Sequence, residues 1–275
     1  MPENLDSLLT EQPNPASARI DQLSTIEMLQ VINAEDRQVA DSITPELPHI
    51  AQAVDAIVEA FRSGGRLFYL GAGTSGRLGV IDASECPPTF NVPPDLVQGI
   101  IAGGESALSH ATETTEDDPA IGVRDLQARK FQPSDILCGI AASGRTPYVL
   151  GAIDEANRLG AVTLGISCTP GSELSRRAGI AITPIPGPEI IAGSTRLKAG
   201  TATKLVLNML TTGAFIRMGY VRGNLMVNVQ PKNAKLLDRA LRIIRTATGA
   251  THEQASAALK AAENNVRAAI ELLKP

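Results

Sequence analysis

The sequence predicts an α/β fold with a five-stranded, mainly parallel sheet between two layers of helices. Five short apolar runs lie at 66–73, 97–104, 135–143, 161–167 and 179–185. Segments with helical spacing separate several of these runs, which is the pattern of a parallel sheet covered on both faces. The chain has 275 residues and is 43% hydrophobic, which is enough to bury a sizeable core.

The expected helices follow from the spacing of apolar residues. These residues recur at helical spacing from Leu47 to Phe61 and stop at Gly64, which can end a helix. A second helical pattern covers 146–160. A longer helix at 197–219 is apolar on more than one side, so we expect it to pack across the sheet or against a second subunit in a homodimer.

Composition and charge exclude several classes of partner. The formal net charge is -4, and no stripe of basic and aromatic residues would attract nucleic acid. The N-terminus lacks a signal-peptide pattern and no stretch approaches about 20 apolar residues, so we expect a cytoplasmic protein with no membrane partner. The three cysteines and three histidines are widely spaced, so we expect no disulfide, metal or other cofactor.

The segment GAGTSGR at 71–77 ends the first predicted strand and opens a helix. Its G-x-G-x-x-G spacing is weak evidence for a dinucleotide site, because it also fits a plain tight turn. A dinucleotide site further needs an acid at the end of the second strand, whereas Asp95 stands before that strand. Thr74 and Ser75 instead place two hydroxyls beside the N–H groups of a helix start, which suits a phosphate monoester.

The same arrangement recurs after the third predicted strand, where S-G-R-T at 143–146 leads into a helix. Two such loops in one sheet favour a sugar phosphate over a dinucleotide, although the residues alone leave the dinucleotide as an alternative. The candidate substrate-binding residues in the two loops are Gly73, Thr74, Ser75, Ser143, Gly144, Arg145 and Thr146.

A third stretch, GSTRLKAGTATK at 193–204, is rich in hydroxyls and cations. Ser194 and Lys198 are therefore further candidates for binding the substrate. Ser194 or Thr195 would serve equally well as the cap of the helix that begins here, and the two roles are compatible.

Four segments in order, at 71–90, 101–118, 139–149 and 193–210, closely resemble the N-acetylmuramic acid 6-phosphate etherases. That family belongs to the sugar isomerase (SIS) superfamily and is related to glucokinase regulatory protein. The similarity runs from about Ile20 to the C-terminus. It implies cleavage of the ether that joins D-lactate to C3 of the sugar phosphate, in the recycling of cell-wall amino sugars.

The resemblance also implies an SIS-type three-layer sandwich and a division of the chain into three parts. These are an N-terminal helical arm at 1–45, a sugar-phosphate domain at 46–235 and a small all-helical segment at 236–275. The last part resembles a ubiquitin-associated (UBA) module, although its helices would also suit dimer packing. Members of the family usually continue for another couple of helical segments, so the completeness of this part is left open.

Cleavage of such an ether is reasonable as an elimination followed by addition of water. Opening of the sugar ring exposes a C1 aldehyde, which acidifies the C2 proton and leaves the C3 oxygen in the β position. One carboxylate is needed to take the C2 proton, and one carboxylic acid to protonate the departing lactate oxygen.

Two acids match the family's motifs. By resemblance, Glu85 in DASECPP is the acid for the leaving lactate and Glu116 in TETTEDD is the C2 base. We expect Glu85 just past a short helix in an apolar segment, where desolvation would favour its protonated form. The acidic run around Glu116 taken alone is typical of an exposed loop. Glu105 and Glu113 are the neighbours most easily mistaken for these two.

Two other functions are compatible with the same fold. An aldose–ketose isomerase also needs a C2 base but no acid for a leaving lactate, so Glu85 favours the etherase. A sugar-phosphate sensor would not need both acids, and a transcriptional one would carry a basic helix-turn-helix segment. The arm at 1–45 contains little Lys or Arg, which argues against that version.

Overall fold

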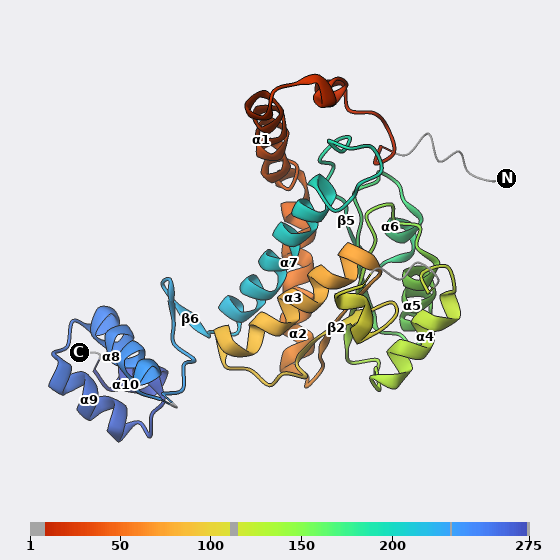
Figure 1. Cartoon of the computed structure of the whole chain (residues 1–275). Helices are drawn as coiled ribbons and strands as arrows, with labels where there is room; N and C mark the ends of the chain where they lie inside the picture. Colours follow the sequence, from red (N-terminus) through yellow and green to blue (C-terminus); the bar gives the residue numbers. More distant parts are fainter. Residues whose placement is uncertain (1–8, 111–114, 232, 274–275) are drawn as a thin grey trace.

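The computed structural model describes residues 9–110, 115–231 and 233–273, and its centre is a five-stranded sheet (Figure 1). The strand order is β2-β1-β3-β4-β5. Every neighbouring pair is parallel, and each strand falls within one of the apolar runs, so the predicted fold class is confirmed. The strands are β1 (Leu67–Gly71), β2 (Val97–Ile101), β3 (Ile136–Ile140), β4 (Val162–Ile166) and β5 (Ile180–Ile182).

One face of the sheet is covered by α2 (Leu47–Arg62), α3 (Gly73–Phe90) and α7 (Lys198–Arg217). These helices pack on strand residues such as Tyr69 and Cys138, both of which are completely buried. The long apolar helix therefore packs across the sheet, as one of the two sequence-based alternatives stated. Despite this composition, none of the helices in the described ranges is long and apolar enough to cross a membrane.

The opposite face is covered by α4 (Pro119–Ala128), α5 (Pro147–Arg158) and α6 (Glu173–Arg177). Phe68 and Leu137 point into this second core. Successive side chains of a strand point to opposite faces, so each apolar strand contributes to both cores. The result is the three-layer arrangement that the sequence predicts.

An N-terminal arm precedes these layers. It contains two short turns, at Pro15–Ser17 and Ile20–Gln22, and the helix α1 (Thr25–Asp41). A capping box starts α1, because Ser24 and Glu27 bond to each other's backbone. Val39 is the buried residue of this helix, which packs near the start of α7 (Figure 1).

A small helical unit follows α7. The hairpin of β6 (Val221–Arg222) and β7 (Leu225–Met226) leads to three helices that stand apart from the sheet layers (Figure 1). They are α8 (Ala234–Thr248), α9 (His252–Ala261) and α10 (Val266–Leu272), and they share a core of their own with residues of the hairpin segment. The helical C-terminal region is confirmed, whereas the hairpin was not predicted.

The helix α3 is longer than the sequence predicted. The prediction ended it before Glu85, but α3 continues to Phe90 and contains Pro87 and Pro88. Proline usually ends a helix, because it lacks an N–H and clashes with the preceding turn. Here the last turn is anchored by tertiary packing, since Phe90 is buried and its ring centroid lies 4.5 Å from that of Phe215.

Candidate active site

The first glycine-rich loop joins β1 to α3 at the carboxyl-terminal edge of the sheet. Gly73 has φ +52°, a left-handed conformation that favours glycine. A Cβ at Gly76 would lie 2.5 Å from the carbonyl oxygen of Gly71, so the helix start can approach the strand only without a side chain there. Thr74 and Ser75 lie in the first turn of α3, where backbone N–H groups lack partners within the helix.

The second loop joins β3 to α5 at the same edge. Gly144 has φ +67°, and a Cβ there would lie 2.3 Å from Cβ of Ser172, so only glycine fits. The N–H of Arg145 donates to Oγ of Ser143 at 3.4 Å. The Thr146 side chain makes no capping hydrogen bond at the start of α5 within the described residues.

The two loops and the start of α7 converge. The N–H of Cys168, after β4, donates to the carbonyl of Ala142 at 2.8 Å, and its sulfur lies 3.8 Å from the carbonyl of Ala199 in α7. A Cβ at Gly200 would lie 3.5 Å from the methyl group of Thr74. Residues from four separate segments of the chain thus meet at the carboxyl ends of the strands, where ligands of open α/β sheets bind.

Glu116 lies next to the second loop. Its carbonyl accepts a hydrogen bond from the N–H of Tyr148 at 3.0 Å, which places it beside the first turn of α5, and its side chain is half-buried. The preceding Thr115 has a buried hydroxyl for which the described residues offer no hydrogen-bond partner. Such a hydroxyl is a natural contact for a ligand.

Glu85 lies elsewhere. It follows Ser75 by ten residues on α3, a separation of about 15 Å along the helix axis. Glu85 is also exposed, so the predicted burial of its side chain is wrong for the single chain. Glu105 is exposed at the start of a short turn, and Glu113 lies outside the described residues. One chain therefore brings Glu116, but not Glu85, to the loops.

Comparison with known proteins shows the family to which the chain belongs. The N-acetylmuramic acid 6-phosphate etherase of Photorhabdus laumondii is 56% identical over 270 residues, which are 98% of this chain and 90% of the relative. The protein of the same name from Clostridium botulinum is 54% identical over 271 residues, with the same coverage of both chains. This chain belongs to that etherase family. Residues 49–157 also match the family of the glucokinase regulatory protein N-terminal SIS domain.

More distant solved structures share the fold of this etherase-family chain. A putative phosphosugar isomerase from Bacteroides fragilis has a TM-score of 0.57 at 20% identity, over 73% of this chain and 95% of that one. A phosphoheptose isomerase from Neisseria gonorrhoeae has a TM-score of 0.53 at 14% identity, over 70% and 99% of the two chains. At these identities the similarity describes the fold alone.

Lys198, a predicted substrate-binding residue of this etherase-family chain, is buried next to the N-terminal arm. It is the first residue of α7, only 1% of it is exposed, and its Nζ lies 2.6 Å from Oε2 of Glu35 in α1. Ser194, in the loop before α7, is half-buried. The ammonium group of Lys198 thus contacts the N-terminal arm, and the role of Lys198 in binding the substrate stays a prediction.

Asp82 is a half-buried acid that sequence reasoning missed. The hydroxyl of Tyr69 donates to its Oδ2 at 3.0 Å and that of Thr211 to its Oδ1 at 3.3 Å, and burial raises the pKa of Asp82 to about 6. Asp82 follows the buried Gly79 by three residues and precedes Cys86 by four. Treating 73–90 as one helix would have placed it on the apolar side.

Proposed function

We propose that this chain cleaves the C3 ether of N-acetylmuramic acid 6-phosphate, giving N-acetylglucosamine 6-phosphate and D-lactate in cell-wall amino sugar recycling. Its membership of the etherase family, at more than half identical residues over almost its whole length, carries the proposal. The isomerase alternative has only the shared fold in its favour. The proposal includes a cytoplasmic location.

In this proposal the two glycine-rich loops hold the phosphate. The N–H groups at the start of α3 and the hydroxyls of Ser75, Ser143 and Thr146 lie at one edge of the sheet. Helix starts favour anions, because their N–H groups are unpaired and carry partial positive charge. Thr74, Gly73, Gly144, Arg145 and Ser194 complete the proposed pocket.

Glu116 and Glu85 divide the chemistry. After ring opening, Glu116 as carboxylate takes the C2 proton and the resulting enolate expels the C3 oxygen. Glu85 as carboxylic acid protonates the departing lactate, and water then adds to the unsaturated sugar, so that the ether is exchanged for a hydroxyl. Glu116 suits its role because it is half-buried beside the second loop.

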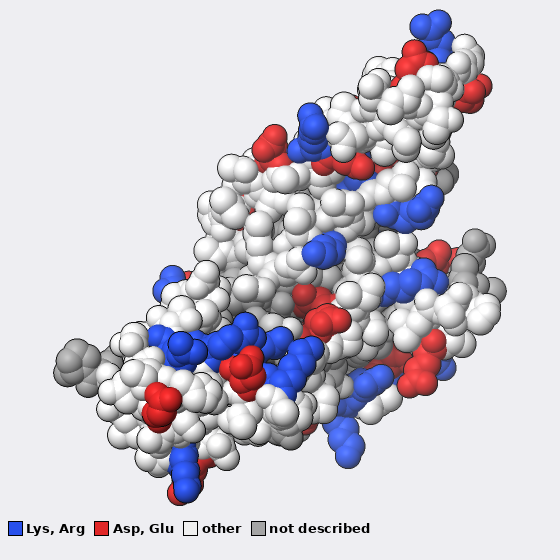
Figure 2. Space-filling model, turned by 60° about the vertical axis from the view of Figure 1, so that its left-hand side comes forward, with Lys and Arg blue, Asp and Glu red and all other residues white. Residues whose placement is uncertain are grey.

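A homodimer, which we also propose, would bring Glu85 to the chemistry from the partner chain. Glu85 lies four residues after Ile81, so the two share one face of α3, and Ile81 is 54% exposed. Met209 and Ile216 of the neighbouring α7 are also exposed. Figure 2, which brings this side of the molecule forward, shows a largely uncharged surface across its middle. A second copy would bury this face and desolvate Glu85.

The activity is tested by incubating the purified protein with N-acetylmuramic acid 6-phosphate and assaying D-lactate. We expect release from the phosphorylated sugar and far slower release from N-acetylmuramic acid itself, because the latter cannot occupy the two loops. Equal turnover of both sugars would contradict the phosphate site. Absence of D-lactate from both would contradict the proposed function.

Mixed dimers test the shared site. Glu85→Gln and Glu116→Gln homodimers are each expected to be inactive. After subunit exchange, half of the dimers are mixed and one of their two sites is intact if Glu85 acts across the interface, so about a quarter of the parent activity should return. No recovery despite exchange would place both acids in one chain's site.

The division of the chain into an arm at 1–45, a sugar-phosphate domain at 46–235 and a UBA-like segment at 236–275 remains part of the proposal. It is supported by the separate core shared by α8, α9 and α10.

Exposed Arg239, Arg242 and Arg245 lie on α8, and Figure 2 shows basic side chains gathered where these helices lie. Limited proteolysis should cut first between α7 and α8 if the two parts fold separately.

A further inference from the structure

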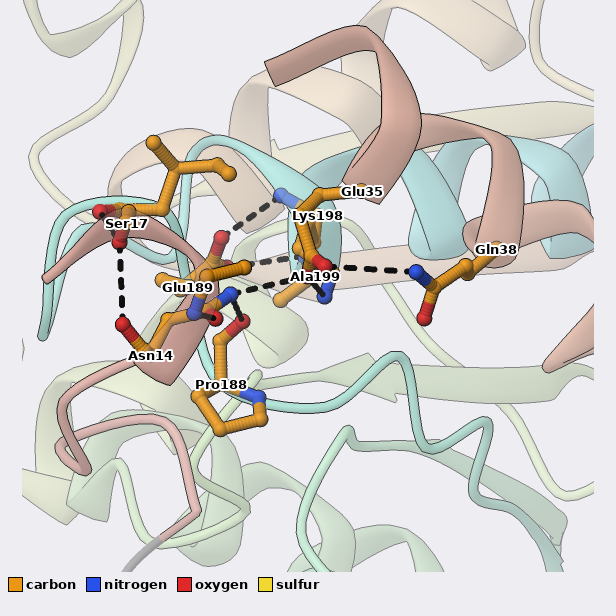
Figure 3. Close-up of polar contacts among 10 residues, drawn as sticks. Asn14, Ser17, Glu35, Gln38, Pro188, Glu189, Lys198 and Ala199 are labelled. Atoms are coloured by element: carbon orange, nitrogen blue, oxygen red, sulfur yellow. Dashed lines mark hydrogen bonds and ion pairs between the residues drawn. The ribbon is translucent and has the colours of Figure 1, made fainter. Parts of the chain in front are cut away.

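The loop between β5 and α7 is closed by a buried carboxylate (Figure 3). Oε2 of Glu189 accepts a hydrogen bond from the N–H of Lys198 at 2.8 Å, and Oε1 accepts one from the N–H of Ala199 at 2.9 Å. Only 1% of Glu189 is exposed. Glu189 thus caps α7 from nine residues upstream, which fixes both ends of the loop that carries Ser194.

The ammonium group of Lys198 ties the same point to the N-terminal arm. It contacts Oε2 of Glu35 at 2.6 Å, and the Asn14 amide donates to that carboxylate at 2.8 Å and to the carbonyl of Pro188 at 3.1 Å. Lys198 holds the pKa of Glu35 below its usual range by hydrogen bonding. A buried ammonium needs such a partner, because an unpaired charge is costly in a protein interior.

The arm touches the loop itself at two more points. Oγ of Ser17 donates to the carbonyl of Ile190 at 2.7 Å, and the N–H of Gly193 donates to the carbonyl of Thr10 at 2.9 Å. Gly193 directly precedes Ser194. Residues from 10 to 35 therefore hold the backbone of the loop.

We propose that Lys198 is a positioning residue of the etherase site, which acts through Glu35 to hold the loop at 189–197 and its hydroxyls in the geometry that binds the sugar phosphate. The N-terminal arm is then one wall of the site. This inference rests on the proposed function. It differs from a direct role of Lys198 at the phosphate, because in that case the ammonium would have to leave Glu35.

The test compares Glu35→Gln, Lys198→Met and the double variant in the full-length protein. The measurements are kcat and KM for D-lactate release and, independently of catalysis, the Kd of inorganic phosphate by calorimetry. We expect both single variants to raise KM and the phosphate Kd by about 10-fold or more while kcat changes less than about 3-fold. The double variant should be no worse than the poorer single one, because the two residues act as a pair.

Two control variants separate positioning from general stability. Asp36→Asn removes the next acid of α1, which is exposed, and should leave KM unchanged. Asp135→Asn breaks the ion pair of the buried Asp135 with the partly exposed Arg66 at the opposite edge of the sheet, and should lower the melting temperature without changing KM.

Three outcomes would overturn the inference. If Lys198→Met raises KM whereas Glu35→Gln leaves it unchanged or lowers it, Lys198 contacts the phosphate directly. If both variants lower the melting temperature but leave KM and the phosphate Kd unchanged, the pair is only structural. If Lys198→Met does not fold, Asn14→Ala, which keeps both charges, should still raise KM by several-fold, and an unchanged KM would count against the inference. A wild-type protein that binds phosphate but releases no D-lactate would refute the proposed function alone.

Discussion

The two edges of the sheet differ in how completely their polar groups are paired. At the amino-terminal edge, both oxygens of Asp135 are used, because they accept bonds from Arg66 and from the N–H of Gln132. Asp135 is 2% exposed, and Arg66 also donates to the carbonyl of Lys130. This edge is a closed network that stabilises the fold.

The carboxyl-terminal edge instead carries glycine loops and helix starts. Gly73 and Gly144 adopt left-handed conformations, and the helix starts beside them lack side-chain caps among the described residues. The first N–H groups of α3 have no partner within the helix, and such groups favour binding of an anion. The difference indicates that stability is concentrated at one edge and function at the other.

Loss of the two acids should have the largest effect, and it acts on function alone. Removal of a general acid or base typically lowers the rate about 100- to 10,000-fold, so Glu85→Gln and Glu116→Gln should each reduce D-lactate release by that much. In heavy water, Glu85→Gln should still exchange the C2 hydrogen, because enolate formation needs only the base. Glu116→Gln should not. Exchange at the parent rate in Glu116→Gln, detected by NMR, would show that Glu116 is not the C2 base.

A substitution in the network at the amino-terminal edge should lower stability and leave the activity unchanged. Asp135→Asn leaves the Arg66 guanidinium without its ionic partner, and we expect the free energy of unfolding to fall by about 3 kcal/mol, since Arg66 is partly exposed. Denaturant unfolding measures the loss, and kcat/KM under native conditions should stay at the parent value. A fall in kcat/KM without loss of stability would contradict the separation of the two edges.

Between the edges, Asp82 should couple stability to pH. Its pKa is about 6 in the folded chain against 3.8 as the unperturbed value, so the folded state binds the proton more tightly. Its presence therefore lowers the free energy of unfolding progressively as pH rises from about 4 to about 6. Relative to the parent, Asp82→Asn should gain at most about 3 kcal/mol between pH 4 and pH 7. A pH-independent difference would show that Asp82 stays ionised in the folded chain.

The smallest effect is expected from a single hydroxyl at the open edge. Ser143→Ala removes one hydrogen bond to a charged group and should weaken phosphate binding by about 1 to 3 kcal/mol. The matched control is Ser63→Ala, an exposed serine at the end of α2, which should leave binding unchanged. Equal binding by the two variants would remove Ser143 from the proposed pocket.

Much of the fold and part of the site were predictable from local sequence. The five strands follow from short apolar runs, and the loops after β1 and β3 follow from glycines next to hydroxyl residues. These are properties of neighbouring residues, because side-chain alternation and left-handed conformations depend on the local backbone. The loops meet simply because carboxyl ends of parallel strands lie at one edge.

What the sequence determined by itself was therefore the parallel sheet, its two glycine-rich loops and the resemblance that names the two acids. The tertiary structure alone decided that α3 runs through two prolines, that Asp82 is half-buried while Glu85 is exposed, and that Lys198 pairs with Glu35, 163 residues away. Burial and ion pairing depend on which distant segments come together. The local spacing of apolar residues does not show which distant segments will meet, because the side chains of a helix acquire their neighbours only when the chain folds.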